Sequence, residues 1–216
     1  MRQIAKQQEP ASLTAYRQTP GANYDDYREK EELRNSLVAE QGALCCYCMG
    51  RIDQDWGSMK IEHWRSQTRY QDDQLSYQNL LGGCMGGQGR PPRYQHCDTR
   101  KGDDDLKFNP ADPSHHIETW ITYSFDGSIH ASDNVFNAQL DKVLNLNLPL
   151  IKNNRKSVWD AVLKWWKSEK NRLHGPPRKE QIERELERYT NGTGDLFPYC
   201  QVAVYLLRQK LAGMAG

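Results

Sequence analysis

The stretch that decides the fold is residues 45–64, which read CCYCMGRIDQDWGSMKIEHW. Cys45 and Cys48 form a C-x-x-C pair, a spacing that lets a tight turn present two thiolates to one metal ion. A second pair, Cys84 and Cys97, follows after the hairpin-like segment and encloses a loop rich in Gly and Pro. Because zinc favours four ligands in a tetrahedron, these cysteines together predict a structural zinc site.

Two alternatives to this ligand set stay open at the level of sequence. Cys46 could replace Cys45, although C-x-C spacing gives a poorer knuckle, and His96 could replace Cys97, because imidazole is an equally good zinc ligand. The sixth cysteine, Cys200, lies in an apolar helical stripe. We interpret Cys200 as a small buried hydrophobic residue.

The bulk composition indicates a folded, intracellular protein. The chain has 216 residues, 37% of them hydrophobic, with 6 Trp and 11 Tyr, which argues against disorder. No apolar stretch is long enough to span a membrane, and the N-terminus has no hydrophobic signal core, so we expect a cytoplasmic location. In a reducing compartment, clustered thiols favour metal binding over disulfides. The net charge of +1 means that any attraction to phosphate must come from local patches or a partner.

Changes of pattern along the chain predict three regions: an N-terminal arm and helix (1–44), a central core with the zinc site (45–110) and a mainly helical C-terminal region (111–216). In the first region, Pro and Gly favour an irregular arm over residues 1–23. The spacing of Leu residues then predicts an amphipathic helix over residues 24–41.

Short apolar runs in the central region predict a hairpin. Its strands would be residues 49–52 and 59–64, joined by a turn at Asp55, Trp56, Gly57 and Ser58. Downstream, either Asp98 or Thr99 could cap a short helix.

The C-terminal region predicts a second hairpin and then helices. The run at residues 121–130 has Asp-Gly between two alternating segments, and helical stripes begin near Phe136. Trp159, Trp165 and Trp166 are expected in the core. This region also carries a series of basic residues: Lys152, Arg155, Lys156, Lys164, Lys167, Lys170, Arg172, Arg178 and Lys179. We interpret them as a solvated helical face, with contact to a nucleic-acid backbone as the alternative.

Residues with catalytic potential lie between and just after the cysteines. Glu62-His63 lies between the two pairs, Asn79-Leu80-Leu81 precedes Cys84, and Cys97 is followed by Asp98, with Lys101-Gly102 three residues later. Each fragment alone is common. The order Cys-x-x-Cys, acid-His, Asn-Leu-Leu, Cys and Cys-Asp-x-x-Lys-Gly resembles the HNH endonuclease superfamily in its zinc-ribbon-supported form.

The resemblance narrows to one group, the PtuB-like HNH proteins encoded beside an ATPase in Septu and retron antiphage systems. It extends over the whole chain and is carried by the opening (Met1, Ile4, Lys6, Glu9-Pro10) and by the runs LRNSLVAEQGALCCYC, IEHWRSQ and QNLLGGC. It implies an α+β fold: a ββα-metal (HNH, His-Me finger) core with a four-cysteine zinc ribbon, plus mainly helical N-terminal and C-terminal additions.

Family roles carry over by position. His63 matches the general base that activates water, and its ordinary pKa near neutrality suits that task. Glu62 and Asp98 match the residues that bind a catalytic Mg²⁺ or Mn²⁺ through oxygens, although relatives often place Asn or His at the latter position. Asn79 matches the residue that orients the catalytic loop. Lys101 and Arg100 are placed to contact phosphate.

The resemblance also implies partners and leaves alternatives. Arg90 and Arg93 lie in the long loop between Cys84 and Cys97, which is either a substrate-contacting loop or a solvated spacer. DNA is the default substrate, with RNA such as tRNA as the alternative; a PtuA-like ATPase, and for a retron its reverse transcriptase with the attached DNA, would be partners. A non-catalytic zinc-ribbon adaptor and a stand-alone restriction-type nuclease are the competing functions.

Overall fold

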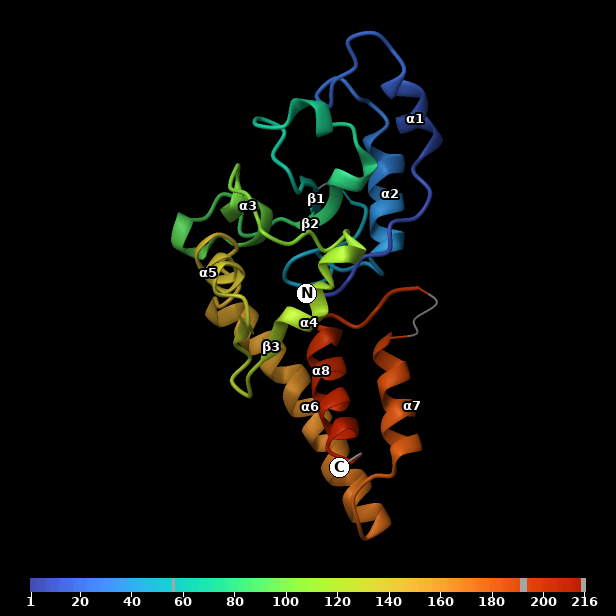
Figure 1. Ribbon diagram of the computed structural model, residues 1–216, viewed down its shortest axis with the longest axis vertical. Coiled ribbons are helices and arrows are strands. Elements are labelled where there is room, and N and C mark those ends of the chain that lie inside the picture. Colours follow the sequence, from blue (N-terminus) through green and yellow to red (C-terminus); the bar gives the residue numbers. More distant parts are fainter. Residues whose placement is uncertain (56, 191–193, 215–216) are drawn as a thin grey trace.

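The computed structural model describes residues 1–55, 57–190 and 194–214. Within these ranges the chain is a mixture of helices and two small antiparallel two-stranded sheets, which confirms the predicted α+β class. The molecule is elongated, with the cysteine-rich region in its upper half and three helices forming a tail at its lower end (Figure 1). The expected turn residue Trp56 lies outside the described residues.

The N-terminal region contains one helix that the sequence did not predict, and its predicted helix is shorter than expected. The expected irregular arm contains a helix, α1 (Ala11–Arg17), whose Leu13 is completely buried, so this prediction was wrong. The following helix, α2 (Lys30–Glu40), begins six residues later than expected. Asn23 and Asp26 exchange hydrogen bonds that hold a turn in place of the first helical turns.

The hairpin predicted within residues 49–64 does not form. β1 (Met59–His63) pairs instead with β2 (Leu80–Cys84), with Lys60 opposite Gly83 and Glu62 opposite Leu81. Residues 44–51 close on themselves through a single bridge between Leu44 and Arg51. Local alternation could not reveal a strand partner about twenty residues downstream.

The segment between the strands and the segment after them consist of loops with short helical turns. Within the long β1–β2 connection lie the 3-10 turns η1 (Gln71–Asp73) and η2 (Tyr77–Asn79), and another, η3 (Pro92–Tyr94), lies in the loop after β2. The short helix α3 (Cys97–Lys101) begins at Cys97, with His96 in the capping position, earlier than either predicted cap. Cys97 is therefore the first residue of this helix.

The second hairpin forms as predicted. β3 (Ile121–Tyr123) pairs with β4 (Ile129–Ala131). It follows η4 (Pro113–His115) and α4 (Ile117–Trp120) and precedes α5 (Asn134–Lys142). Arg155 is buried beneath the hairpin turn, where its Nε donates to the Gly127 carbonyl at 2.7 Å. This basic residue is thus a structural clamp and not part of a solvated face.

Three helices form the tail: α6 (Pro149–Leu173), α7 (Lys179–Thr190) and α8 (Cys200–Ala212). They enclose a small apolar core of their own, made of Val162, Ile182, Ala203, Leu206 and Leu207. The three tryptophans of α6 pack against this core, as expected, and Cys200 is buried among apolar residues. Among the described helices, none is both long and apolar enough to cross a membrane.

Candidate metal centre and the adjoining acid–histidine site

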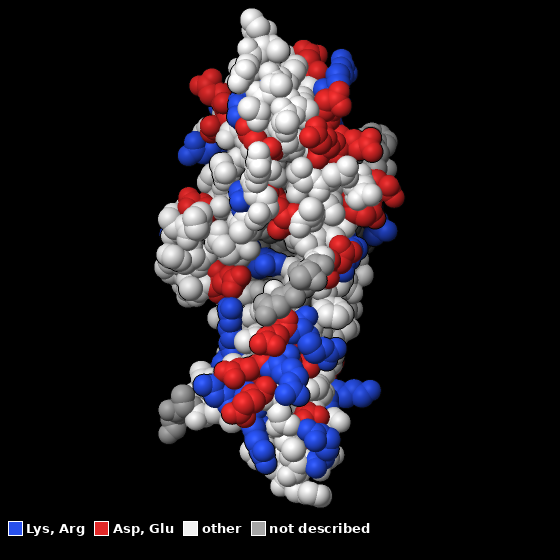
Figure 2. All heavy atoms as spheres, turned by 90° about the vertical axis from the view of Figure 1, so that its right-hand side faces the viewer, with Lys and Arg blue, Asp and Glu red and all other residues white. Residues whose placement is uncertain are grey.

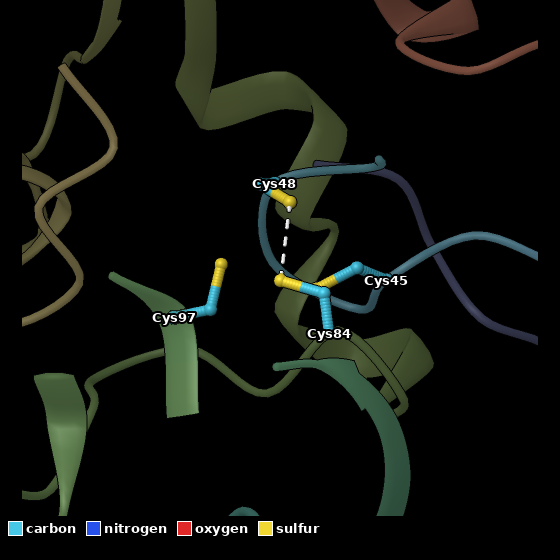
Figure 3. A group of neighbouring side chains, drawn as sticks. All are labelled: Cys45, Cys48, Cys84 and Cys97. Atoms are coloured by element: carbon cyan, nitrogen blue, oxygen red, sulfur yellow. Dashed lines mark hydrogen bonds between the residues drawn. The ribbon is translucent and has the colours of Figure 1, made fainter. Parts of the chain in front are cut away.

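Four cysteines converge from three separate segments (Figure 3). Cys45 and Cys48 lie on the knuckle before β1, Cys84 ends β2, and Cys97 begins α3. Their sulfur atoms all lie within 4.8 Å of one another, and all but Cys84 are buried. This is the set of ligands predicted from spacing, and four sulfurs at such distances can hold one zinc ion.

The alternative ligands Cys46 and His96 lie next to the four-cysteine cluster but are not part of it. His96 has its Nδ1 3.2 Å from the Cys97 sulfur, so it borders the site, while the sulfur itself remains with the other three. Cys46 is buried, and its backbone N–H donates to the Gly82 carbonyl. The geometry therefore favours Cys45 and Cys97 as the ligands.

Ionisation of these thiols depends on their mutual contacts. Burial opposes ionisation of Cys45, but hydrogen bonds from the neighbouring thiols outweigh burial and lower its pKa. Burial and the contact with Cys45 raise the pKa of Cys97 well above its usual range. Because metal-bound cysteines are thiolates, a zinc ion bound here would stabilise the ionised form of thiols such as Cys97, whose ionisation burial opposes.

The carboxylates of Glu62 and Asp98 lie close together beside the cysteine cluster. Asp98 directly follows Cys97, and Gly83 directly precedes Cys84. A methyl group added at Gly83 would lie 3.6 Å from the Cβ of Asp98 and 3.6 Å from that of Glu62. Gly83 thus lies between Glu62 and Asp98, in ordinary van der Waals range of both, and the two carboxyl groups are close enough to affect each other's pKa.

Glu62 is the buried member of this pair. Its Oε1 accepts from the hydroxyl of Tyr47 at 2.7 Å and lies 2.9 Å from the Nζ of Lys101. Burial and the nearby Asp98 raise the pKa of Glu62 well above its usual range, against the opposing effect of Lys101. Tyr47 lies between Cys45 and Cys48, so the knuckle that carries these two cysteines also holds Glu62 through this hydrogen bond.

Asp98 is the more accessible member. Its Oδ2 lies 3.0 Å from the Nζ of Lys60, on the neighbouring strand. Burial opposes its ionisation, but contacts with Glu62 and Lys60 outweigh burial and lower the pKa of Asp98. The pair therefore ionises stepwise, with Asp98 first.

His63 is oriented by the loop that follows it. Its Nε2 lies 3.0 Å from the Gln74 carbonyl oxygen, and the Tyr24 ring packs edge-on against the imidazole at 4.4 Å. A carbonyl can only accept, so Nε2 carries the proton and Nδ1 keeps its lone pair when the ring is neutral. Burial lowers the pKa of His63, and Asp98 is close enough to oppose that shift.

Asn79 fixes the same loop from its far end. Its side chain accepts from the Arg65 N–H at 2.7 Å and donates to the carbonyls of Arg65 and Asp73. Its own carbonyl accepts from the Trp64 N–H. Asn79 thus closes the β1–β2 connection directly after His63, in keeping with the orienting role that the resemblance implies.

The predicted phosphate contacts divide into two groups. Lys101 has a side chain that is 0% exposed, paired with Glu62 and donating to the His63 carbonyl, so it cannot reach a phosphate in this arrangement. Arg90, Arg93 and Arg100 are exposed on the loop before α3 and on α3 itself. The sequence pattern could not separate these groups because a lysine three residues after Asp98 can face either way on a short helix.

Sequence reasoning missed three residues of the site. Tyr47 and Lys60 contact the two carboxylates, and Tyr24 covers the histidine. Lys60 could have been found, because residues two apart on a strand share one face. Tyr24 could not, because it reaches the site from a turn in the distant N-terminal region of the sequence.

The site brings two carboxylates close together on β1 and α3, and His63 follows Glu62 on β1. Two carboxylates in mutual reach repel each other once both are ionised, and a divalent cation between them would relieve that repulsion. The carboxylate oxygens are donors of the kind that a hard cation prefers, although Lys60 and Lys101 already neutralise part of their charge. No known family model matches the chain, and a search of curated proteins finds none that is similar to it.

Proposed function

We propose that this protein is a metal-dependent endonuclease that hydrolyses phosphodiester bonds, with β1, β2 and α3 forming a ββα-metal core of the HNH type. The observation that supports the proposal is that Glu62 and Asp98 lie on either side of Gly83, with Lys101 linking Glu62 to the backbone carbonyl of His63, on a unit that four cysteines draw together. In this proposal the two carboxylates would bind the cation and the histidine would act as the base.

In this proposal His63 is the general base. Its Nδ1 takes a proton from water while Nε2 stays bonded to the Gln74 carbonyl, which holds the ring in the required tautomer. Glu62 and Asp98 would hold Mg²⁺ or Mn²⁺, which stabilises the charge that develops on the phosphate and the leaving oxygen. Asn79 keeps the loop after His63 in position.

Nucleic-acid binding would draw on two basic surfaces. One is formed by Arg90, Arg93 and Arg100, which are exposed on the loop before α3 and on α3. The other is on α6, where Lys164, Lys167 and Lys170 are exposed and without an ion pair among the described residues. DNA is the proposed substrate. Cleavage of RNA, including tRNA, is the alternative that a comparison of substrates would reveal.

The test is a matched pair of histidine variants assayed on supercoiled DNA and on total tRNA with Mg²⁺ or Mn²⁺. His63→Ala should lower the cleavage rate by about 10²–10⁴-fold, the usual contribution of a general base. His130→Ala, which alters an exposed histidine on β4, should leave the rate unchanged. Equal rates in His63→Ala and wild type, with folding and zinc content intact, would contradict the proposal.

We further propose that the nuclease acts as the effector of an antiphage complex with an ATPase subunit. This rests on the resemblance to PtuB-like proteins and on the large non-nuclease tail. Co-expression with a PtuA-like ATPase should give a complex that survives size-exclusion chromatography. Failure to associate would favour a stand-alone nuclease.

One observation favours a second candidate, a non-catalytic zinc-ribbon adaptor. Each carboxylate of the pair already contacts a lysine, which is how a purely structural charge cluster would be satisfied. An adaptor would bind no second metal ion and would tolerate His63→Ala without loss of function. The nuclease proposal predicts the opposite for both measurements.

A further inference from the structure

We propose that Lys60 occupies the place of a divalent cation beside Asp98 and competes with that cation for the site. The proposal rests on the proposed function, because it concerns the affinity of the same carboxylate pair for its catalytic metal ion. It makes Lys60 a residue that sets how much Mg²⁺ or Mn²⁺ the enzyme needs.

The backbone places Lys60 on the correct face. Lys60 and Glu62 are two residues apart on β1, so both side chains project toward α3. The Nζ of Lys60 lies 3.0 Å from Asp98 Oδ2 and 3.0 Å from the Oγ1 of Thr99. Thr99 in turn donates to the Met85 carbonyl, which fixes its hydroxyl oxygen as an acceptor.

The two lysines at the pair differ in how readily they can leave. Lys101 has a side chain that is 0% exposed and a second anchor on the His63 carbonyl. Lys60 has a side chain that is 27% exposed, and its partner Asp98 is 21% exposed. Lys60 therefore lies at the open side of the pair, and its flexible stem can carry the ammonium into solvent.

Charge explains why the two cations exclude each other. With both carboxylates ionised, two lysines balance them, so the group of four side chains has no net charge. A divalent ion added to this group would lie close to two ammonium groups and gain little. Withdrawal of Lys60 restores one negative charge and frees an oxygen of Asp98, so the ion can bind only as Lys60 moves away.

The test measures Mn²⁺ binding directly, by electron paramagnetic resonance or calorimetry on the zinc-loaded full chain. Lys60→Met keeps much of the length of the stem and removes the charge, and it should bind Mn²⁺ on the order of tenfold more tightly than wild type. Lys60→Arg keeps the charge and should stay close to the wild-type affinity. Thermal melting of both variants controls for folding, and Lys60→Gln provides a second charge-removing variant.

The outcomes separate the two proposals. Equal or weaker Mn²⁺ binding in folded Lys60→Met and Lys60→Gln, with clear binding by wild type, would overturn the role of Lys60 and leave the nuclease proposal standing. Absence of Mn²⁺ binding in wild type and in both variants, with zinc retained, would contradict the catalytic metal itself. Tighter binding in both charge-removing variants and unchanged binding in Lys60→Arg would support the competition.

Discussion

The cysteine-rich region and the helical tail differ in the length of their helices and strands and in the contacts that hold them together. Around the cysteines the regular elements are short, since β1, β2 and α3 each have five residues. The tail contains a 25-residue helix and an apolar core between three helices. The cysteine-rich region also has an apolar core, since Met59 and Leu81 are buried beside the cysteines, but its short strands and loops are drawn together in addition by four thiols that could share one metal ion.

The part of the chain before α6 and the tail also differ in charge. Residues 1–148 carry 16 Lys and Arg against 21 Asp and Glu, whereas residues 149–216 carry 13 against 7. Figure 2 shows the blue side chains gathered over the lower end of the molecule, with acids between them, and more acids than bases over the upper end. The positive charge that could attract phosphate thus lies largely on the tail, away from the carboxylates.

Removal of one zinc ligand should have the largest effect, confined at first to the cysteine-rich region. Cys97→Ala removes a ligand and also loosens the start of α3, so we expect loss of zinc, loss of cleavage and unfolding of that region. Zinc content by mass spectrometry and melting by circular dichroism measure this. Cys46→Ala is the matched control and should keep its zinc; loss of zinc in the control alone would reassign the ligand.

A cavity in the tail should destabilise the other half without touching the metal. Leu207 is completely buried in the core between the helices, so Leu207→Ala should lower the free energy of unfolding by about 2–5 kcal/mol. Urea denaturation followed by tryptophan fluorescence reports it, because the tryptophans of α6 surround that core. Loss of zinc from this variant under native conditions would show that the halves do not act separately.

Charge reversal on α6 should weaken nucleic-acid binding by a smaller factor. Lys164, Lys167 and Lys170 changed together to Glu should reduce affinity by about tenfold or more and lower the salt dependence by up to about three charges. Fluorescence anisotropy at several salt concentrations measures both. The control compares two single variants, Lys167→Glu on α6 and Lys179→Glu on α7, because Lys179 already pairs with Glu183. An equal loss of affinity in both would argue against a docking face on α6.

The smallest of these effects should be the change of the cleavage rate with pH near neutrality. The base form of His63 is the neutral ring, and its pKa lies below the ordinary value because of burial. Cleavage should therefore change little between pH 8 and 7 and fall only as the pH drops below the ordinary histidine pKa of about 6.5. A steep loss of activity already between pH 8 and 7 would point to another titrating group.

Local patterns in the sequence predicted part of this molecule, and contacts between distant segments decided the rest. The spacing of the cysteines identified all four sulfurs, and Asp-Gly identified the second hairpin. The partner of β1 was missed because strand pairing across a long connection depends on the whole fold. Lys101 was placed in the wrong environment, since burial of a lysine follows from its pairing with Glu62 and leaves no mark in the sequence.

The most direct measurement is anomalous X-ray diffraction from crystals of the wild-type protein soaked with Mn²⁺, recorded at the zinc and manganese absorption edges. We predict zinc between the sulfurs of Cys45, Cys48, Cys84 and Cys97, and manganese bound by Glu62 and Asp98 with the Lys60 ammonium displaced. Zinc at the cysteines with no manganese at the carboxylates, and with both lysine contacts intact, would contradict this prediction.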